Sequence, residues 1–489
     1  MPSWMLLLTV VLPLFGGTAM YFFAKFFPIR GRLILGWTTV GLTSVLTLLL
    51  VIFGVDEPLM LFSFAPGLDV VLRLDGMGRF FAALVAVLWP LTTCYAKGYM
   101  THMPHRTLFY SFFLMAYSTT LGVAFSGSFV TLYCFYELLT LSTLPLVMHA
   151  LTPEAIRAGL RYLALSIGGA AFALVGMIFL HNQGVSLNFR AGGWVSADTE
   201  NTLMLQMAYF TMYMGFGVKA AIFPFHSWLP SAAVAPTPVT ALLHAVAVVK
   251  SGAFAILRLT YFCFGTAILA GTWAQGSAMV MALLTILFGS SVALKQSHWK
   301  RRLAYSTISN LSYLLFGITL MSPAGMVAAM LHLIFHALTK ILAFFAAGNV
   351  LHMTEREYQP QLNGLGYKMP VTFVCFTISA LSLTGVPGLC VFVSKTALVS
   401  AAFDLTHPIA WAGAVVIILS ALLTAIYMIS TAVRAWYPNR DETLQLDDVR
   451  EADATMWIPM VIIAAAIVVL GLCAAPVVSA AQSIAALCF

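Results

Sequence analysis

Apolar runs recur along the whole chain, separated by short stretches that contain proline, glycine and charged residues. Each run is long enough to cross about 30 Å of hydrocarbon as a helix, whereas the alternating pattern of membrane β-strands is absent. The pattern therefore predicts an all-α polytopic membrane protein with about fourteen transmembrane helices. The predicted helices cover residues 4–24, 33–54, 78–97, 107–125, 128–149, 159–181, 203–224, 237–262, 270–294, 303–321, 324–351, 371–396, 408–436 and 456–482.

Composition strengthens this prediction, because 61% of the 489 residues are hydrophobic and only 8% are charged. A water-soluble core could not bury that much apolar surface, so the chain must lie in lipid. The run from Trp4 lacks a basic leading region and a small-residue cleavage site, and we expect no removable signal peptide. The seven cysteines are scattered without a C-x-x-C pair; we interpret them as packing residues and expect no metal site.

The formal net charge of +7 would suit nucleic-acid binding, but the placement of the basic residues indicates membrane topology instead. Sixteen of the 24 Lys and Arg residues fall in odd-numbered connections, and only Arg73, Arg79, Arg190 and Arg258 fall in even-numbered ones. Since cytoplasmic loops collect basic residues, we expect both termini on the non-cytoplasmic side of the cell (inner) membrane. We expect no nucleic-acid partner.

Five charged residues interrupt the apolar runs: Glu137, Lys219, Lys250, Lys340 and Lys395. A charge in the middle of a span costs roughly 2.5–3.5 kcal/mol on insertion scales, so each is a candidate functional residue. For a lysine near a helix end, the alternative is that its ammonium group extends to the lipid headgroups. Glu137 is the single carboxylate that the sequence places deep in a predicted helix.

His332, His336 and Lys340 recur every four residues. Their side chains drift only about 80° around a helix and form one polar stripe. Histidine changes protonation near neutral pH, so the stripe predicts a proton relay. The competing use is a haem ligated by these histidines with His244 on a facing helix.

Two predicted helices contain interruptions close to a buried lysine. Four prolines follow Lys219, and two glycines and a proline precede Lys395. Such interruptions free backbone groups at membrane depth, and matching interruptions in two halves of a chain are typical of inverted repeats in transporters. The residues concerned are Pro224, Pro230, Pro236, Pro238, Gly385, Pro387 and Gly388.

At these residues the chain resembles a known family, the antiporter-like subunits shared by respiratory complex I, Mrp-type cation/proton antiporters and energy-converting membrane hydrogenases. The similarity spans roughly residues 70–400, and APTPVTALLHA and RLAYSTIS are its most specific strings. The strings that carry it are FYELLTLSTLPLV, HSWLPSAAVAPTPVTALLHAVAVVKSG, KRRLAYSTISNLSY, HLIFHALTK and GVPGLCVFVSK.

The resemblance implies fourteen helices with two inverted five-helix repeats, in which helices 7 and 12 are broken. It predicts four segments: residues 1–106 with helices 1–3, residues 107–262 with the first repeat, residues 263–436 with the second repeat, and residues 437–489 with an acidic cytoplasmic loop and helix 14.

The resemblance also implies roles for the buried residues. Glu137 is similar to the family's fifth-helix glutamate and Lys219 to its seventh-helix lysine partner. The remaining proton-transfer candidates are His244 and Lys250 in helix 8, His332, His336 and Lys340 in helix 11, and Lys395 in helix 12. The chain departs from the family pattern at Ser231 and His298, where many members carry Asp, and at Gly388 and Val391, where Pro and Gly are usual.

A protonation switch at the Glu137–Lys219 pair is the mechanism that we expect. Opposite charges 4 Å apart gain about 4 kcal/mol at an effective dielectric near 20, which suffices to change where a proton resides. Opening the pair would release Lys219 to influence Lys250 and then the groups as far as Lys395.

These observations predict a membrane component of a larger complex that translocates protons or exchanges protons for another cation. The chain shows no catalytic centre or cofactor fingerprint, so we expect other membrane subunits of a redox-driven oxidoreductase or hydrogenase to supply the energy. The alternative is a component of a gradient-driven Mrp-type Na⁺/H⁺ antiporter. A sodium site needs several oxygen ligands, and Glu137 is the single carboxylate placed deep in a predicted helix, so the sequence favours protons as the transported ion. A haem enzyme and a purely structural membrane anchor are the remaining hypotheses.

Overall fold

The computed structural model describes residues 1–489 except 24–25, 27, 56, 196–200 and 439–447. Residues 439–447, in the predicted acidic loop, therefore lie outside the described residues. The helices are α1 (Trp4–Phe22), α2 (Ile29–Phe53), α3 (Gly76–Tyr99), α4 (Arg106–Ala124), α5 (Phe129–Val147), α6 (Pro153–Asn182), α7 (Thr202–Gly217), α8 (Trp228–Ser231), α9 (Thr237–Ala245), α10 (Val248–Arg258), α11 (Trp273–Lys295), α12 (Trp299–Thr319), α13 (Pro323–Thr354), α14 (Pro370–Thr384), α15 (Cys390–Phe403), α16 (Pro408–Trp436), α17 (Ala454–Leu472) and α18 (Ala475–Ala485).

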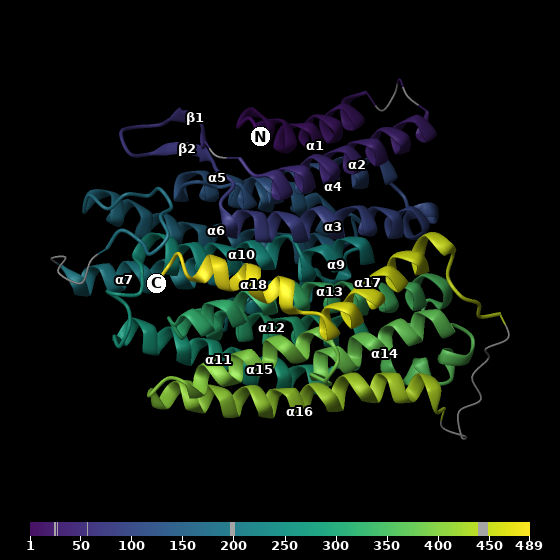
Figure 1. The fold of residues 1–489 in the computed structure, drawn as a ribbon. Coiled ribbons are helices and arrows are strands. Elements are labelled where there is room, and N and C mark those ends of the chain that lie inside the picture. Colours follow the sequence, from purple (N-terminus) through teal and green to yellow (C-terminus); the bar gives the residue numbers. More distant parts are fainter. Residues whose placement is uncertain (24–25, 27, 56, 196–200, 439–447) are drawn as a thin grey trace.

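Most of these helices run side by side in one bundle (Figure 1). Eleven helices of the described residues are long and apolar enough to cross a membrane. Their outward faces carry exposed apolar side chains, as expected for contact with lipid; Phe15, Val175, Val415 and Leu422 are all more than half exposed. The all-α polytopic fold class is confirmed.

The interruptions predicted in helices 7 and 12 are present. Helix α7 ends at Gly217, and irregular backbone, a 3₁₀ turn (Phe225–Ser227), α8 and a second 3₁₀ turn (Ala232–Val234) follow it. Helix α14 ends at Thr384, where Gly385 adopts a left-handed φ of 97°, and α15 begins at Cys390. Glycine adopts this conformation without the steric cost that a Cβ brings, so the sequence stops the helix there.

Two further predicted helices are also split, which the apolar pattern did not indicate. The eighth is divided into α9 and α10 at Val246 and Ala247, and a π-helical segment (Leu259–Phe264) follows α10. The fourteenth is divided into α17 and α18. Proline lacks the N–H that would continue the hydrogen-bond ladder, so Pro476 at the start of α18 accounts for the second break.

A β-hairpin lies between α2 and α3, where the sequence predicted only a connection. Strand β1 (Leu59–Ser63) pairs antiparallel with β2 (Asp69–Leu72), and Leu59 faces Leu72. The turn contains Gly67 with a left-handed φ of 80°. Figure 1 shows the hairpin and both termini toward the same end of the bundle.

At that end an ion pair joins α3 to α10 and corrects the placement of Arg258. The sequence pattern assigned Arg258 to a connection, but its side chain is fully buried at the end of α10. Its two terminal nitrogens donate to the two carboxylate oxygens of Asp75 at 2.5 and 2.6 Å. Asp75 also caps α3, because its Oδ1 accepts the Gly78 N–H at 2.8 Å.

Helix α13 positions most of the predicted relay because it lies in the interior of the bundle. It packs against α9, α12, α14, α15 and α17. Ser322 caps its start by accepting the Gly325 N–H, and Pro323 at the first helical position suits that geometry. The polar stripe of α13 is therefore fully buried, since His332, His336 and Lys340 have no exposed surface.

Candidate functional site

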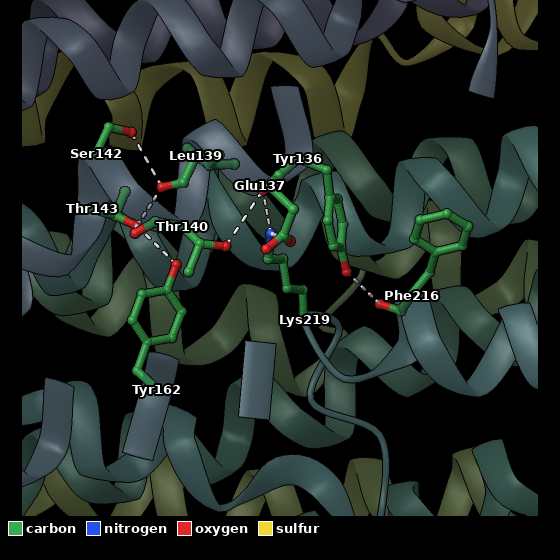
Figure 2. Close-up of polar contacts among 9 residues, drawn as sticks. All are labelled: Tyr136, Glu137, Leu139, Thr140, Ser142, Thr143, Tyr162, Phe216 and Lys219. Atoms are coloured by element: carbon green, nitrogen blue, oxygen red, sulfur yellow. Dashed lines mark hydrogen bonds and ion pairs between the residues drawn. The ribbon is translucent and has the colours of Figure 1, made fainter. Parts of the chain in front are cut away.

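The first part of the candidate site joins α5 to the interruption after α7. Lys219 follows the end of α7 and is fully buried; its Nζ lies 3.4 Å from Glu137 Oε1 (Figure 2). The same Nζ donates to the main-chain carbonyl of Tyr136 and lies 3.3 Å from the centroid of the Tyr136 ring. The ammonium group therefore has a carboxylate, a carbonyl and an aromatic face as partners, which together compensate the cost of burying its charge.

Hydroxyl groups surround this ion pair. Thr140 donates its Oγ1–H to the Tyr136 carbonyl at 3.4 Å, and the hydroxyls of Thr143 and Tyr162 lie 2.8 Å apart (Figure 2). The Tyr136 hydroxyl donates to the Phe216 carbonyl at 3.2 Å. The sequence pattern singled out none of these residues, although Tyr136, Thr140 and Thr143 lie within the FYELLTLSTLPLV string.

The second part of the site joins α10 to α13. Lys250 Nζ lies 2.8 Å from His336 Nδ1, and both side chains are fully buried. The rings of His336 and His332 stack with centroids 5.6 Å apart and an angle of 12° between their planes. His332 Nδ1 lies 2.9 Å from Ser394 Oγ on α15, so a continuous row of polar groups connects the three helices.

Lys395 lies at the end of this row, in the second turn of α15, and its ammonium group reaches back to the end of α14. Its Nζ donates to the carbonyls of Leu383 and Thr384 at 2.6 and 3.3 Å. Main-chain carbonyls at a helix C-terminus lack intrahelical partners and carry partial negative charge, so they suit a cation. The Tyr313 ring contacts both His332 and Lys395: its centroid lies 5.5 Å from that of His332 and 5.3 Å from Lys395 Nζ.

Lys340 and His244 lie toward the opposite end of α13. Lys340 Nζ donates to the Leu303 carbonyl of α12 at 3.1 Å. The His244 ring packs against Phe344 with centroids 4.7 Å apart, and neither ring nitrogen has a hydrogen-bond partner among the described protein atoms. Both Lys340 and Lys300 lie within electrostatic range of His244.

Lys300 is a residue that the sequence pattern assigned to a connection. It lies in the first turn of α12, where its side chain is buried and its Nζ donates to the Ala235 carbonyl at 3.1 Å. Its one signal in the sequence is that it begins the KRRLAYSTISNLSY string, which carries the family resemblance.

The structure thus forms two clusters from the predicted residues. One contains Glu137 and Lys219; the other contains Lys250, His336 and His332 and reaches Lys395 through Ser394 and Tyr313. Within the described chain, no hydrogen bond or ion pair joins Lys219 to Lys250. The link between the two clusters is therefore electrostatic or requires intervening groups.

A buried row of ionisable side chains in a bundle of membrane helices defines a class of proteins that move ions across bilayers. Residues 126–424 match the family described as NADH:quinone oxidoreductase/Mrp antiporter, TM. This match covers more than half of the chain, and the chain belongs to this family of antiporter-like membrane proteins.

The chain is similar both to subunits of NADH-quinone oxidoreductases and to subunits of cation/proton antiporters. The chain is 31% identical to the N subunit of the NADH-quinone oxidoreductase of Desulforudis audaxviator over 83% of either chain. It is 34% identical to the A/B subunit of a probable K(+)/H(+) antiporter of Rhizobium meliloti over 70% of this chain and 34% of that protein. It is 28% identical to the A1 subunit of the Na(+)/H(+) antiporter of Staphylococcus aureus over 95% of this chain and 60% of that protein. The chain therefore spans only part of the two antiporter relatives.

Solved structures share the fold over nearly the whole chain. A chain of the membrane-bound sulfane sulfur reductase, an archaeal respiratory membrane complex, has a TM-score of 0.86 at 23% identity and covers 99% of either chain. A chain of the Mrp complex from Dietzia sp. has a TM-score of 0.84 at 20% identity, covering 99% of this chain and 97% of that one. At these identities the likeness establishes the fold alone.

Proposed function

We propose that this chain translocates protons through the bilayer along its buried polar row, as one component of a larger membrane complex. The observation that carries the proposal is the contiguous contact series from Lys250 through His336 and His332 to Ser394, beside Lys395. Proton transfer between side chains needs hydrogen-bond contact, directly or through one water. Lys250 and His336, and His332 and Ser394, lie within that distance, whereas the step between the stacked rings of His336 and His332 needs a bridging water or a ring rotation.

The Glu137–Lys219 pair is the proposed input to this row. At 3.4 Å each charge stabilises the other, so a change in the protonation of Glu137 alters the affinity of Lys219 for its own proton. Lys219 lies in irregular backbone, where its side chain can reorient without breaking a helical ladder. Reorientation of Lys219 would then act on Lys250 through the intervening electrostatic field.

Exposure of Glu137 supports assembly with other membrane subunits. Its side chain is 24% exposed on the outward side of α5, next to exposed Leu138 and Leu141. An ionised carboxylate that faces hydrocarbon is costly, so we propose that a neighbouring protein or a hydrated contact covers it. The named relatives and the solved neighbours are subunits of complexes, which agrees with this proposal.

Protons are the favoured ion because the row is built from nitrogen bases. Lysine and histidine carry protons, whereas sodium prefers a set of oxygen ligands. In the second cluster the oxygens near Lys395 come from the carbonyls of Leu383 and Thr384 and the hydroxyl of Ser394, and no carboxylate joins them among the described contacts. The alternative function, within a gradient-driven Na⁺/H⁺ antiporter, would need oxygen ligands from a neighbouring protein.

The driving energy is proposed to come from elsewhere in the assembly. The relay histidines contact Lys250 and Ser394 and stack on each other, so they are already engaged in protein contacts, and we propose that the chain works without a haem or other cofactor of its own. We also propose that both termini lie outside the cytoplasm, since the basic connections gather at the end opposite to the termini.

Transport by the purified native assembly in sealed vesicles tests the proposal. We expect Glu137→Gln and Lys219→Ala to lower the rate of proton uptake by about a hundredfold, the scale of losing a proton-transfer group. Glu355→Gln and Lys368→Ala are matched controls, because both remove an exposed charge away from the row. Wild-type rates in the Glu137 and Lys219 variants would refute the proposal.

The choice between redox and gradient coupling needs one more measurement on the same vesicles. Proton uptake that follows addition of an electron donor, without any sodium or potassium gradient, supports a redox-driven complex. Proton movement driven by a cation gradient alone, in the absence of a donor, supports the antiporter alternative. Mass-spectrometric identification of the copurifying proteins provides independent evidence.

A further inference from the structure

A polar cavity of about 500 Å³ lies outside the relay, between the start of α6, the short helix α8 and the start of α12. Three arginines line it: Arg157 and Arg161 from α6 and Arg301 from α12. Its volume falls within the range of small-molecule sites. It opens at the end of the bundle that the distribution of basic residues predicts to be cytoplasmic.

The positive charge of this cavity is only partly compensated. Arg301 forms an ion pair with Glu154 at 3.3 Å. Arg161 donates to the neutral hydroxyl of Ser231 at 3.0 Å, and Arg157 donates to a main-chain carbonyl of its own helix at 3.2 Å. Neither Arg157 nor Arg161 has a carboxylate partner among the described residues, so the arginine pocket carries a net charge of about +2.

Guanidinium groups from two helices that face one cavity are suited to an oxyanion. Arginine offers parallel N–H donors that match two phosphate oxygens at once, and it keeps its charge at every physiological pH. We propose that the arginine pocket binds one phosphate-bearing anion, and that the anion is the headgroup of an anionic phospholipid. Arg157 and Arg161 would hold the phosphate from one side and Arg301 from the other.

The lipid-facing surface of α6 favours a lipid over a free phosphate. Ile156, Leu160 and Ile167 are 40%, 54% and 50% exposed and lie on one face of the helix. Residues 156 and 160 directly precede Arg157 and Arg161, so the apolar face borders the pocket. A headgroup held by the arginines would leave its acyl chains free to run along this face of α6.

An anion in the arginine pocket would connect the two helices, α6 and α12, that flank the interruption after α7. Helix α8 lies within that interruption and packs against both α6 and α12. An anion that joins the arginines of α6 and α12 would therefore hold α8 between them. Ser231 of α8 is central to the geometry because it is the hydroxyl that Arg161 contacts.

Titration of the partly delipidated native assembly with phosphatidylglycerol, followed by native mass spectrometry, tests the proposal. The variants are Arg157→Gln combined with Arg161→Gln, and Ser231→Asp, which places a carboxylate beside Arg161. The matched control is Lys368→Gln combined with Arg450→Gln, which removes two exposed positive charges away from the pocket. Phosphatidylcholine and inorganic phosphate serve as the comparison ligands, and an intact stoichiometry of the complex in the spectra verifies folding.

The proposal predicts one tightly bound phosphatidylglycerol whose affinity falls about tenfold in both pocket variants and stays unchanged in the control. The double variant Arg157→Lys, Arg161→Lys retains the charge but lacks the planar guanidinium groups. Its affinity for phosphatidylglycerol should lie between that of the control and that of the two pocket variants. Inorganic phosphate that binds as tightly and shows the same losses would support the anion site but assign it to a soluble ligand. Equal affinity in pocket and control variants, or an acidic segment of a copurifying protein crosslinked into the pocket, would overturn the proposal.

Discussion

Lys250 and His336 face each other across α10 and α13 with 2.8 Å between Nζ and Nδ1, and both side chains are fully buried. When Lys250 is an ammonium group, His336 Nδ1 accepts its proton in a hydrogen bond, and Nε2 carries the ring hydrogen. A proton that arrives at Lys250 can therefore pass to His336 with little movement of either side chain. In the proposed proton pathway, this contact is the step that joins the first predicted repeat to the second.

Removal of either partner should stop transport through the row. We expect His336→Ala and Lys250→Ala each to lower proton uptake by reconstituted vesicles by about a hundredfold. The double variant should be no worse than either single one, because the two groups act as a unit. His181→Ala, which removes a histidine of α6 outside the row, is the matched control. Additive losses in the double variant would indicate that the two residues act separately.

The contact between His332 and Ser394 predicts a smaller and more specific effect. Ser394→Ala removes the hydroxyl 2.9 Å from His332 Nδ1 and leaves a buried ring nitrogen without that partner. We expect the transport rate to fall by up to about tenfold, the scale of one hydrogen bond. Ser394→Thr, which keeps a hydroxyl, should restore most of the rate. Ser400→Ala, on the same helix but exposed, should have no effect, and a loss there equal to that of Ser394→Ala would contradict the assignment.

The sequence predicted the charged members of the site because charge is rare in apolar runs. Glu137 and Lys219 stood out in this way and lie 3.4 Å apart in the structure. The glycines before Lys395 likewise predicted the break that supplies its two carbonyl partners. In each case, one residue type carries an energetic cost in a membrane helix that only a specific environment offsets.

The remaining parts of the site depend on how the helices pack, which periodicity does not determine. Ser394 and Tyr313 are ordinary in membrane helices, and only the approach of α12 and α15 to α13 makes them neighbours of His332. The break between α9 and α10 contains neither proline nor glycine, so no local signal marks it. The sequence pattern assigned Arg258 to a connection between helices, because its partner, Asp75, is distant in the sequence and no local signal indicates the ion pair.

The Asp75–Arg258 pair predicts an acid-sensitive contribution to stability. Burial of Asp75 acts to raise its pKa, but the charge and hydrogen bonds of Arg258 and the Gly78 N–H outweigh burial and lower the pKa below 3.8. A carboxylate whose folded pKa is lowered stabilises the folded state fully above its unfolded pKa of about 3.9, and this contribution is lost as the pH falls through the folded pKa.

Substitution of Asp75 should therefore have a pH-dependent effect. At pH 7 we expect Asp75→Asn to destabilise the protein by about 3–5 kcal/mol, because Arg258 remains buried without its counter-charge. The difference from wild type should shrink below about pH 4, because there Asp75 binds a proton in the unfolded chain while the folded carboxylate is still ionised, which favours unfolding of the wild type. Thermal unfolding in detergent between pH 7 and pH 3 measures this. Asp404→Asn, an exposed control, should leave the profile unchanged, and a pH-independent loss in Asp75→Asn would rule out the electrostatic explanation.

Gly385 connects backbone geometry to the position of Lys395 and provides the most direct test of the broken helix. Its φ of 97° is unfavourable for any L-residue, and a Cβ there would lie 3.3 Å from Lys395 Cδ. We expect Gly385→Ala to cost about 1–2 kcal/mol of stability and to displace the Lys395 ammonium from the Leu383 and Thr384 carbonyls, so that transport falls further than stability alone explains. Gly168→Ala is the control, since a Cβ at this helical position of α6 meets nothing within 4 Å and should be neutral or stabilising. Thermal unfolding and vesicle transport on the same preparations separate the two effects. Full transport by a destabilised Gly385→Ala protein would show that the carbonyl partners of Lys395 are not needed for transport.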